Sequence, residues 1–571
     1  GQQPMVSVRG GAGLRAGRDV LPARAAMMPL LFHGKPDAPV VYAGMREVET
    51  HGRDAHSLEN AFGQDAHATG GADLVAVVFN GCIYNHRELR KELLAAGHEF
   101  VSDHSDTEVL LHGWRAWGEG LFDRLDGMYA LAIWDAGMGE LILSRDSFGE
   151  KPLLFARGLD QSGAMALTFA SVATPMAKMS MHKAIAPEHQ RCDRGLEEWL
   201  RFGHAATPPG EFLCTVGAGR TYVERGSDYR HEPHGPVFSE AGRPARTTPM
   251  APVDAESLLV ASIRDRLEAD VPLGCFLSGG IDSSLVAFLA RRELGGLRSF
   301  CVRMPDPRDD ESEIASEVAR IAGTTHSTLD CRANPAADLQ MLIRQVGVPL
   351  GDSSLLPTYW VSGAARAHVA VALAGDGGDE MFLGYERYRA AALIARHRGL
   401  LAALDVPLRR LPVRGTRSLL ARGARLAAAA NGLGYTDLAS VFPSRELRQL
   451  LSRPPQPGYH DGRWTGLSEA VLWDVQFYLP NDLMRKVDTA SMAVALEVRS
   501  PFLAPTLAKS CLSATPESLM PRGRRKGLLR QVARKYFPAA IVDRPKQGFA
   551  IPIGEWFRSD YGGMKQLLMD H

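Results

Sequence analysis

The sequence predicts an α/β protein whose two halves are built differently. Residues 5 to about 183 carry short apolar runs between a few segments of helical spacing, which is typical of a β-rich domain. From residue 254 onward, strand and helix patterns alternate, which favours a doubly wound parallel sheet. Beyond Tyr388 the pattern is mostly helical, so we expect a helical C-terminal part.

In the first half, three short apolar runs predict buried strands at residues 74–79, 129–134 and 140–144. Helical spacing predicts helices at 88–96 and 106–117. Residues 224–248 are rich in Gly, Pro, His and Arg and lack periodicity, which indicates a linker or a surface hairpin.

The second half alternates in a regular way. We expect strands at 271–277, 299–304 and 368–374, and helices at 254–268, 282–292 and 311–321. Strands separated by helices cannot pair as hairpins, so the connections must cross over and the strands run parallel.

Composition excludes several classes of protein. The 571 residues include 65 basic and 65 acidic side chains, so no net field favours nucleic acid or a membrane surface as a partner. No apolar run approaches the roughly 18 residues that span a bilayer. The seven cysteines are scattered and include no C-x-x-C pair, which argues against zinc and a disulfide framework. We therefore expect a cytoplasmic protein.

The most informative segment is the loop at residues 277–284, Leu-Ser-Gly-Gly-Ile-Asp-Ser-Ser. A strand that runs into a glycine-rich turn at a helix N-terminus forms an anion site, because free N–H groups and the helix dipole attract phosphate. Ser278, Ser283 and Ser284 add hydroxyl donors. Asp282 suits such a site only if a cation such as Mg²⁺ joins it to phosphate. No lysine follows as in G-x-x-x-x-G-K-[ST], so a P-loop enzyme is disfavoured.

A second polar loop follows the strand predicted at residues 368–374. Gly375-Asp376-Gly377-Gly378-Asp379-Glu380 begins where the strand ending at residue 374 stops. Open α/β sheets bind ligands at the carboxyl ends of their strands. We therefore expect Asp379 to join Asp282 in a Mg²⁺–pyrophosphate site, although such a turn taken alone often only reverses the chain.

With these loops in place, the sequence resembles the asparagine synthetase B family over nearly its whole length. The loop at 278–284 is similar to the pyrophosphate loop of ATP-pyrophosphatases. The resemblance to the synthetase half also rests on segments 349–362, 375–385, 482–502 and 546–552, and that to the glutaminase half on segments 79–89, 105–111 and 144–152.

The resemblance implies the architecture and three parts of the chain. It implies an N-terminal Ntn-type αββα sandwich of the amidotransferase kind at 5–190, a connecting segment at 191–250, and an ATP-pyrophosphatase domain at 251–571. In the family, a carboxylate attacks the α-phosphate of ATP to give an acyl-adenylate and pyrophosphate, and an amine then displaces AMP.

The resemblance also implies roles for individual residues, with ATP and Mg²⁺ as cofactors. Asp282 and Asp379 would hold the metal, and Lys526 and Asp376 would be catalytic. Lys526 could instead be one more surface base of a basic run, and Asp376 could simply brace its turn. The residues expected to bind ATP or pyrophosphate are Leu277, Ser278, Gly280, Asp282, Ser283, Ser284, Val302, Gly375 and Lys486.

The glutaminase half departs from the family pattern. The family places a cysteine directly after the initiator methionine, whereas Met5 is followed by Val6. The family's Asn-Gly-Glu reads Asn80-Gly81-Cys82, and Asp106 of the Ser-Asp-Thr-Glu motif remains. We expect a degenerate glutaminase site, because Cys82 as a relocated nucleophile would lack the terminal amine and an evident base.

Three functions remain open. The first is an amide-bond-forming synthetase of natural-product biosynthesis, such as a lasso-peptide macrolactam cyclase or a β-lactam synthetase-like enzyme. The second is an asparagine synthetase that uses ammonia, and the third is a catalytically silent nucleotide-binding scaffold. The expected partners are small-molecule or peptide carboxylates and amines, and either a second copy of the chain or a partner biosynthetic protein.

Overall fold

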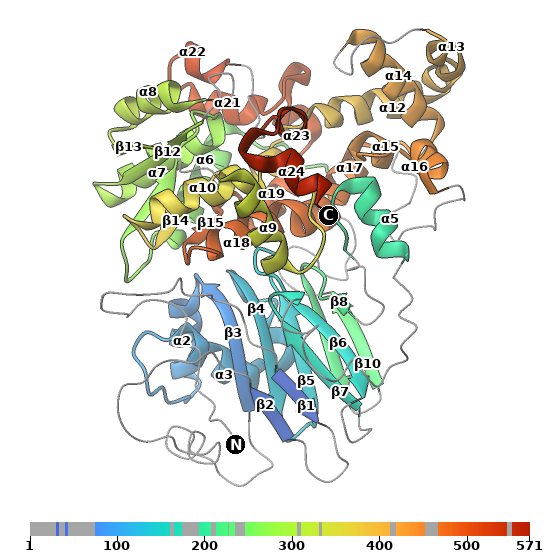
Figure 1. Cartoon of the computed structure of the whole chain (residues 1–571). Helices are drawn as coiled ribbons and strands as arrows, with labels where there is room; N and C mark the ends of the chain where they lie inside the picture. Colours follow the sequence, from blue (N-terminus) through green and yellow to red (C-terminus); the bar gives the residue numbers. More distant parts are fainter. Residues whose placement is uncertain are drawn as a thin grey trace.

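The computed structural model describes most of the chain in thirteen stretches. They are residues 30–33, 40–43, 75–159, 165–173, 193–206, 213–225, 228–233, 246–304, 310–330, 334–411, 418–451, 466–544 and 551–570. Val6, and residues 546–550 of one quoted segment, lie outside them. The described elements form a strand-rich N-terminal domain and a larger, mostly helical C-terminal domain that lie side by side (Figure 1).

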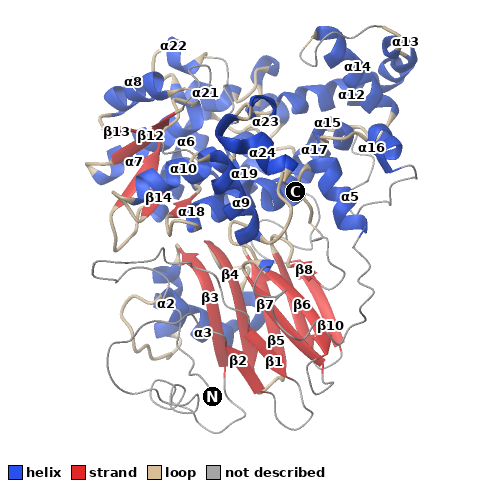
Figure 2. Ribbon diagram, in the orientation of Figure 1, coloured by secondary structure: helices blue, strands red, loops and turns tan. Residues whose placement is uncertain are grey.

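Two antiparallel sheets make up the N-terminal domain (Figure 2). The first sheet has the order β2 (Val40–Ala43), β1 (Leu30–His33), β7 (Met165–Ala170), β6 (Leu154–Leu159) and β8 (Leu213–Thr215). The second has the order β10 (Asp228–Pro233), β9 (Arg220–Arg225), β5 (Glu140–Arg145), β4 (Gly127–Asp135) and β3 (Val75–Ile83).

The alternation of side chains along β4 explains how these sheets are layered. Leu131 and Ile133 pack with the helices α2 (His86–Ala95) and α3 (Asp106–Trp117). Ala132 and Trp134 point the other way and pack against β6 and β7 of the first sheet. Successive residues of a strand face opposite sides, so an almost continuous apolar run marks a strand covered on both faces. This layering confirms the predicted two-sheet sandwich.

Residues 191–250, expected as a connector, contribute strands to both sheets. β9 and β10 form an antiparallel hairpin at the edge of the second sheet, and β8 pairs with β6 of the first. The hairpin expected within 224–248 is therefore confirmed in part, because β10 lies in that range whereas β9 begins before it, at residue 220. The segment 191–250 also contains α5 (Asp193–Phe202).

The C-terminal domain contains the predicted parallel sheet. Its order is β13 (Thr325–Asp330), β12 (Arg298–Arg303), β11 (Leu273–Phe276), β14 (Val371–Leu373) and β15 (Glu497–Arg499), and every pair is parallel. The chain moves outward from β11 to β13 and then returns to the other side of β11 at β14. Strand order therefore reverses between β11 and β14, which is the switch point where doubly wound sheets bind ligands.

The other described elements of the C-terminal domain are mostly helices (Figure 2). Before β15 they are α6 (Pro252–Arg266), α7 (Ile281–Leu294), α8 (Ser312–Ala322), α9 (Pro335–Val346), α10 (Leu355–Arg366), α11 (Gly378–Met381), α12 (Glu386–Ala403), α13 (Asp405–Arg409), α14 (Leu419–Asn431), α15 (Tyr435–Ala439), α16 (Ser444–Leu451), α17 (Leu467–Trp473), a π-helical segment (Asp474–Leu483) and α18 (Met484–Met492). After it come α19 (Pro505–Ser513), α20 (Pro516–Leu519), α21 (Gly527–Ala533), α22 (Ala539–Val542), α23 (Ile553–Ser559) and α24 (Met564–Met569). Among these described helices, none is both long enough and apolar enough to cross a membrane.

Candidate active site

The loop at 277–284 joins β11 to α7 at the switch point. Gly279 adopts φ +72°, and a Cβ there would lie 2.6 Å from the Ile314 side chain, so this turn requires glycine. The Ser283 hydroxyl accepts from the Ser278 N–H at 3.3 Å, and the Ser284 hydroxyl donates to the Gly280 carbonyl at 2.7 Å. The loop is thus held compactly at the start of α7, where the first-turn N–H groups of a helix lack helical partners and can bind an anion.

The loop after β14 lies directly against the first one. A Cβ on Gly375 would stand 3.0 Å from Cβ of Asp282, and one on Gly378 would stand 2.9 Å from Cγ of Asp282. Only residues without a side chain allow the two loops to approach this closely. The sequence expectation that the two polar loops meet at one edge of the sheet is therefore met by the structure.

Lys526 lies at the centre of this meeting point. Its ammonium nitrogen is 2.5 Å from Oδ2 of Asp282 and 2.7 Å from Oδ1 of Asp379. Burial opposes the charge of Lys526, but Asp282 and Asp379 outweigh it and hold the pKa of the ammonium above its ordinary value. The lysine is 4% exposed, which is incompatible with its alternative interpretation as a solvated surface base.

Two local features hold Lys526 in place. Its backbone has φ +51°, a left-handed conformation that is rare outside glycine, at the N-cap of α21. A Cβ on Gly384 would stand 1.9 Å from Oδ1 of Asp379 and 2.2 Å from Cε of Lys526. The ammonium reaches the carboxylates because residue 384 has no side chain.

Asp282 and Asp379 supply carboxylate oxygens, the kind of ligand that Mg²⁺ prefers, from two adjoining loops. Across the described residues, no group of three or more His, Cys, Asp or Glu side chains could hold a metal. Mg²⁺, however, is commonly held by one or two carboxylates together with substrate phosphates. Asp282 and Asp379 already converge on one cationic centre, beside the loop that would hold the phosphates.

These features agree with comparisons to known proteins. Residues 254–570 match the asparagine synthase family, and residues 2–215 match the glutamine amidotransferase domain. The chain belongs to the asparagine synthase family. Membership of this family implies a carbon–nitrogen ligase.

Two relatives show how far the family likeness extends. The chain is 30% identical over 509 residues to asparagine synthetase [glutamine-hydrolyzing] 1 of Bacillus subtilis, covering 85% of this chain and 77% of that protein. It is also 30% identical over 519 residues to a putative asparagine synthetase [glutamine-hydrolyzing] of Mycobacterium tuberculosis H37Rv, covering 85% and 76%. A solved B. subtilis glutamine phosphoribosylpyrophosphate amidotransferase, complexed with ADP and GMP, is 14% identical over 63% of this chain and 72% of that one, with a TM-score of 0.23 that carries no argument.

Lys486 lies in a second charged cluster next to the one around Lys526. Its ammonium donates to the Ser354 hydroxyl at 3.1 Å and lies 3.5 Å from Oδ2 of Asp352. Asp376 connects the two clusters electrostatically. Burial raises the pKa of Asp376, Lys486 opposes that rise, and the charges of Asp282 and Asp379 add to it. Asp376 therefore lies within electrostatic reach of both clusters.

Several charged or polar residues of the site were missed by sequence reasoning. Tyr385 donates to Oε1 of Glu380 at 2.7 Å, and burial together with the charge of Asp379 raises the pKa of Glu380 to about 7. Asp482 is buried near Lys486, and burial together with Asp352 raises its pKa to about 8. The sequence offered one signal for these residues: Asp352, Glu380 and Asp482 all lie inside segments that carry the family resemblance.

Two expected ATP-binding residues have buried side chains. Leu277 lies in the main apolar core and Val302 in a second apolar cluster. The Leu277 N–H is already bonded to the Phe300 carbonyl at 2.9 Å. Either residue could meet a ligand only through remaining backbone groups, while Ser278 and Gly280 belong to the loop itself.

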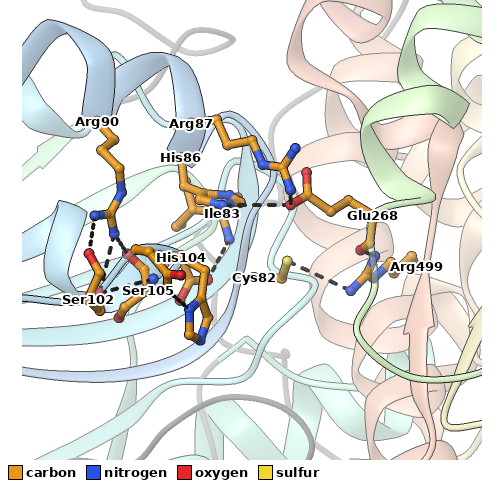
Figure 3. A network of polar contacts seen from close by, with 12 residues as sticks. Cys82, Ile83, His86, Arg87, Arg90, Ser102, His104, Ser105, Glu268 and Arg499 are labelled. Carbon is orange, nitrogen blue, oxygen red and sulfur yellow. Dashed lines mark hydrogen bonds and ion pairs between the residues drawn. The ribbon is translucent and has the colours of Figure 1, made fainter.

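The segment expected to form a degenerate glutaminase site lies where the two domains meet (Figure 3). Asn80 donates to the Ser171 hydroxyl at 3.3 Å, and Asp106 accepts from the Ile83 N–H at 3.2 Å. The Cys82 sulfur accepts from the Arg499 guanidinium of the C-terminal domain at 3.8 Å. Burial raises the pKa of Cys82 to about 12, so its thiol stays protonated and is a poor nucleophile near neutral pH.

Gly81 completes this strand segment. A Cβ on Gly81 would stand 2.0 Å from the Met128 carbonyl oxygen, so the strand requires glycine there. Val6 lies outside the described residues, and its place in the site stays a prediction.

The first prediction concerns the charge balance around Lys526. Lys526→Met should destabilise the protein by about 3–5 kcal/mol, because it leaves two adjacent carboxylates without their shared cation. Millimolar Mg²⁺ should recover part of that loss, since it binds only the folded state. Thermal unfolding with and without Mg²⁺ measures both effects. Lys535→Met, which removes an exposed lysine paired with Glu256, is the control. If Mg²⁺ raised the unfolding temperature equally in wild type, Lys526→Met and Lys535→Met, the assignment of Asp282 and Asp379 as metal ligands would be contradicted.

A second prediction follows from the pKa of Asp482. In the folded protein this pKa is about 8, above the ordinary value of 3.8, so the folded state holds the proton more tightly than the unfolded state. The contribution of Asp482 to stability should therefore fall as pH rises from about 4 to 8, by up to about 1.4 kcal/mol per pH unit. Denaturant unfolding of wild type and Asp482→Asn should give free energies that diverge over this range. Parallel curves would show that Asp482 titrates normally.

Proposed function

We propose that this protein is an AMP-forming amide synthetase that activates a carboxylate with ATP and takes its amine from a source other than glutamine. The observation that supports adenylation is the convergence of Asp282 and Asp379 on Lys526, next to the phosphate-binding geometry of the loop at 277–284. Positive charge at this point stabilises a departing diphosphate, because negative charge builds up on its oxygens.

Each group has a part in the proposed reaction. A substrate carboxylate oxygen forms a bond to the α-phosphorus as the bond to pyrophosphate breaks, while Ser278, Ser283 and N–H groups of α7 bind the pyrophosphate. Bound by Asp282 and Asp379, Mg²⁺ would neutralise phosphate charge. Lys526 donates to the phosphate oxygens. The amine nitrogen then bonds to the acyl carbon, AMP leaves, and Asp376 accepts the amine's proton.

Loss of glutamine hydrolysis is supported by the chemistry at position 82. Where the family pattern has a glutamate for the amine of glutamine, this chain has Cys82, which faces Arg499 across the domain boundary. A neutral thiol cannot replace a carboxylate in pairing with an ammonium group. The relatives are named glutamine-hydrolysing, so this residue distinguishes the chain from the function that their names state.

A second candidate is an ammonia-dependent asparagine synthetase, which the names of the relatives favour. The first candidate covers a natural-product ligase such as a macrolactam-forming enzyme, with a small-molecule or peptide substrate. A silent scaffold is disfavoured, since it has no need of a buried lysine held between two carboxylates.

The two candidates separate by pyrophosphate release. Aspartate with ammonium should release pyrophosphate and form asparagine only if the second candidate holds, whereas the first predicts turnover with another carboxylate and amine. Glutamine should give no glutamate in either case, and Cys82→Ser should not change that result. Glutamate release by wild type that Cys82→Ser abolishes would overturn the loss of glutaminase function.

Variants of the central cluster test the adenylation site. Asp282→Asn should abolish pyrophosphate release while the protein stays folded. Lys526→Ala should lower kcat by about 10²- to 10³-fold, as loss of one charged donor to the transition state typically does. Lys535→Ala provides the matched control, because Lys535 is an exposed lysine of the same domain. Unchanged turnover in Lys526→Ala would remove it from the reaction.

A further inference from the structure

We propose that the N-terminal domain positions the synthetase site mechanically: residues 145–151, the bracing loop, fix the helical segments that carry Asp482 and Lys486. This inference rests on the proposed function, because it assigns these two residues to the site of that reaction. It gives the N-terminal domain a role that does not require glutamine chemistry.

The bracing loop is held compactly because two of its charged side chains, Arg145 and Asp146, bond to its own backbone. Arg145 is 1% exposed and donates to the carbonyls of Lys151 at 2.6 Å and Gly149 at 2.8 Å. Asp146 accepts from the backbone N–H groups of Phe148 at 3.0 Å and Lys151 at 3.0 Å. A loop tied at both ends by buried charged groups can transmit position to whatever it contacts.

The first contact is with the π-helical segment at Pro480. Gly149 adopts φ +65°, and a Cβ there would stand 2.8 Å from Cβ of Pro480, so the loop presses its backbone against the proline. The Arg145 guanidinium donates to the Pro480 carbonyl at 3.5 Å. Proline has no N–H and interrupts the bonding of the helix that contains it, so such a segment needs external support.

The second contact is a buried ion pair. The Lys151 ammonium lies 2.9 Å from Oδ1 of Asp488 on α18, and the two side chains are 5% and 11% exposed. Burial opposes the charge of Lys151, but Asp488 outweighs it and raises the pKa of the lysine. A pair this buried resists separation, because either partner alone would be a buried, uncompensated charge.

The two contacts flank the residues that they would position. Pro480 precedes Asp482, and Asp488 follows Lys486, so the bracing loop grips the polypeptide on both sides of the site residues. Between these contacts, Lys486 reaches Asp352 and Ser354. Anchoring both ends fixes the rotation of the helix, and therefore the direction in which Lys486 points.

Asp488→Asn tests the brace. It should lower kcat for pyrophosphate release at least 10-fold, because Lys486 would no longer be held in position. In a Lys486→Met background, the same change should have no further effect on kcat. Amide hydrogen exchange across residues 474–492 should become faster. Lys151→Arg, which keeps the charge, should retain wild-type turnover.

The matched control is Asp126→Asn. Asp126 forms another ion pair across the domain boundary, with the buried Arg266 at 3.3 Å, but it contacts neither Pro480 nor Asp488 through that pair. It should change neither kcat nor exchange at 474–492. Equal effects of Asp126→Asn and Asp488→Asn, or an undiminished effect of Asp488→Asn in the Lys486→Met background, would overturn the brace.

Exchange is measured without substrate, so it separates this inference from the proposed function. If wild type releases no pyrophosphate with any carboxylate, the proposed function fails. Unchanged exchange at 474–492 in both Asp488→Asn and Lys151→Met would overturn the brace even if wild type turns over normally. If Asp488→Asn does not fold, Lys151→Met carries the same comparison.

Discussion

The synthetase half depends on one electrostatic constraint, the placement of a buried ammonium between two carboxylates. Asp282 comes from the loop after β11, Asp379 from the loop after β14 and Lys526 from the N-cap of α21. None of these charges is stable at this depth without the others. The parallel sheet supplies the frame, because the reversal of strand order brings the first two loops together and leaves room for a third element above them.

Much of this arrangement could be predicted from the sequence. The two glycine-rich loops can be recognised from their composition and from their position directly after apolar strands. The strand β13 was not predicted, because Thr325–Asp330 is a polar, half-buried edge strand with little apolar periodicity. β15 was missed because its three residues are too few to show a period. The neighbourhood of Lys486 was also beyond sequence reasoning, since Asp352 and Asp482 meet it only through tertiary packing.

Buried charges serve different purposes in the C-terminal domain and at the domain boundary. In the C-terminal domain, buried charges are arranged around a point where phosphate would bind. At the domain boundary, buried cations such as Arg266 and Arg499 instead meet Tyr84, Asp126 and Cys82 of the N-terminal domain. These contacts connect the surfaces of the two domains. The connection does not depend on any reaction within the N-terminal domain.

Gly384 has a consequence for how the protein tolerates change. The atoms nearest to its missing side chain belong to Asp379 and Lys526, so even a methyl group would act by pushing opposite charges apart and not by crowding a hydrocarbon core. In a survey of all single substitutions, position 384 would behave like a reactive residue although none of its own atoms takes part in bond making. Sensitivity to mutation and chemical participation are separate properties at this corner of the molecule.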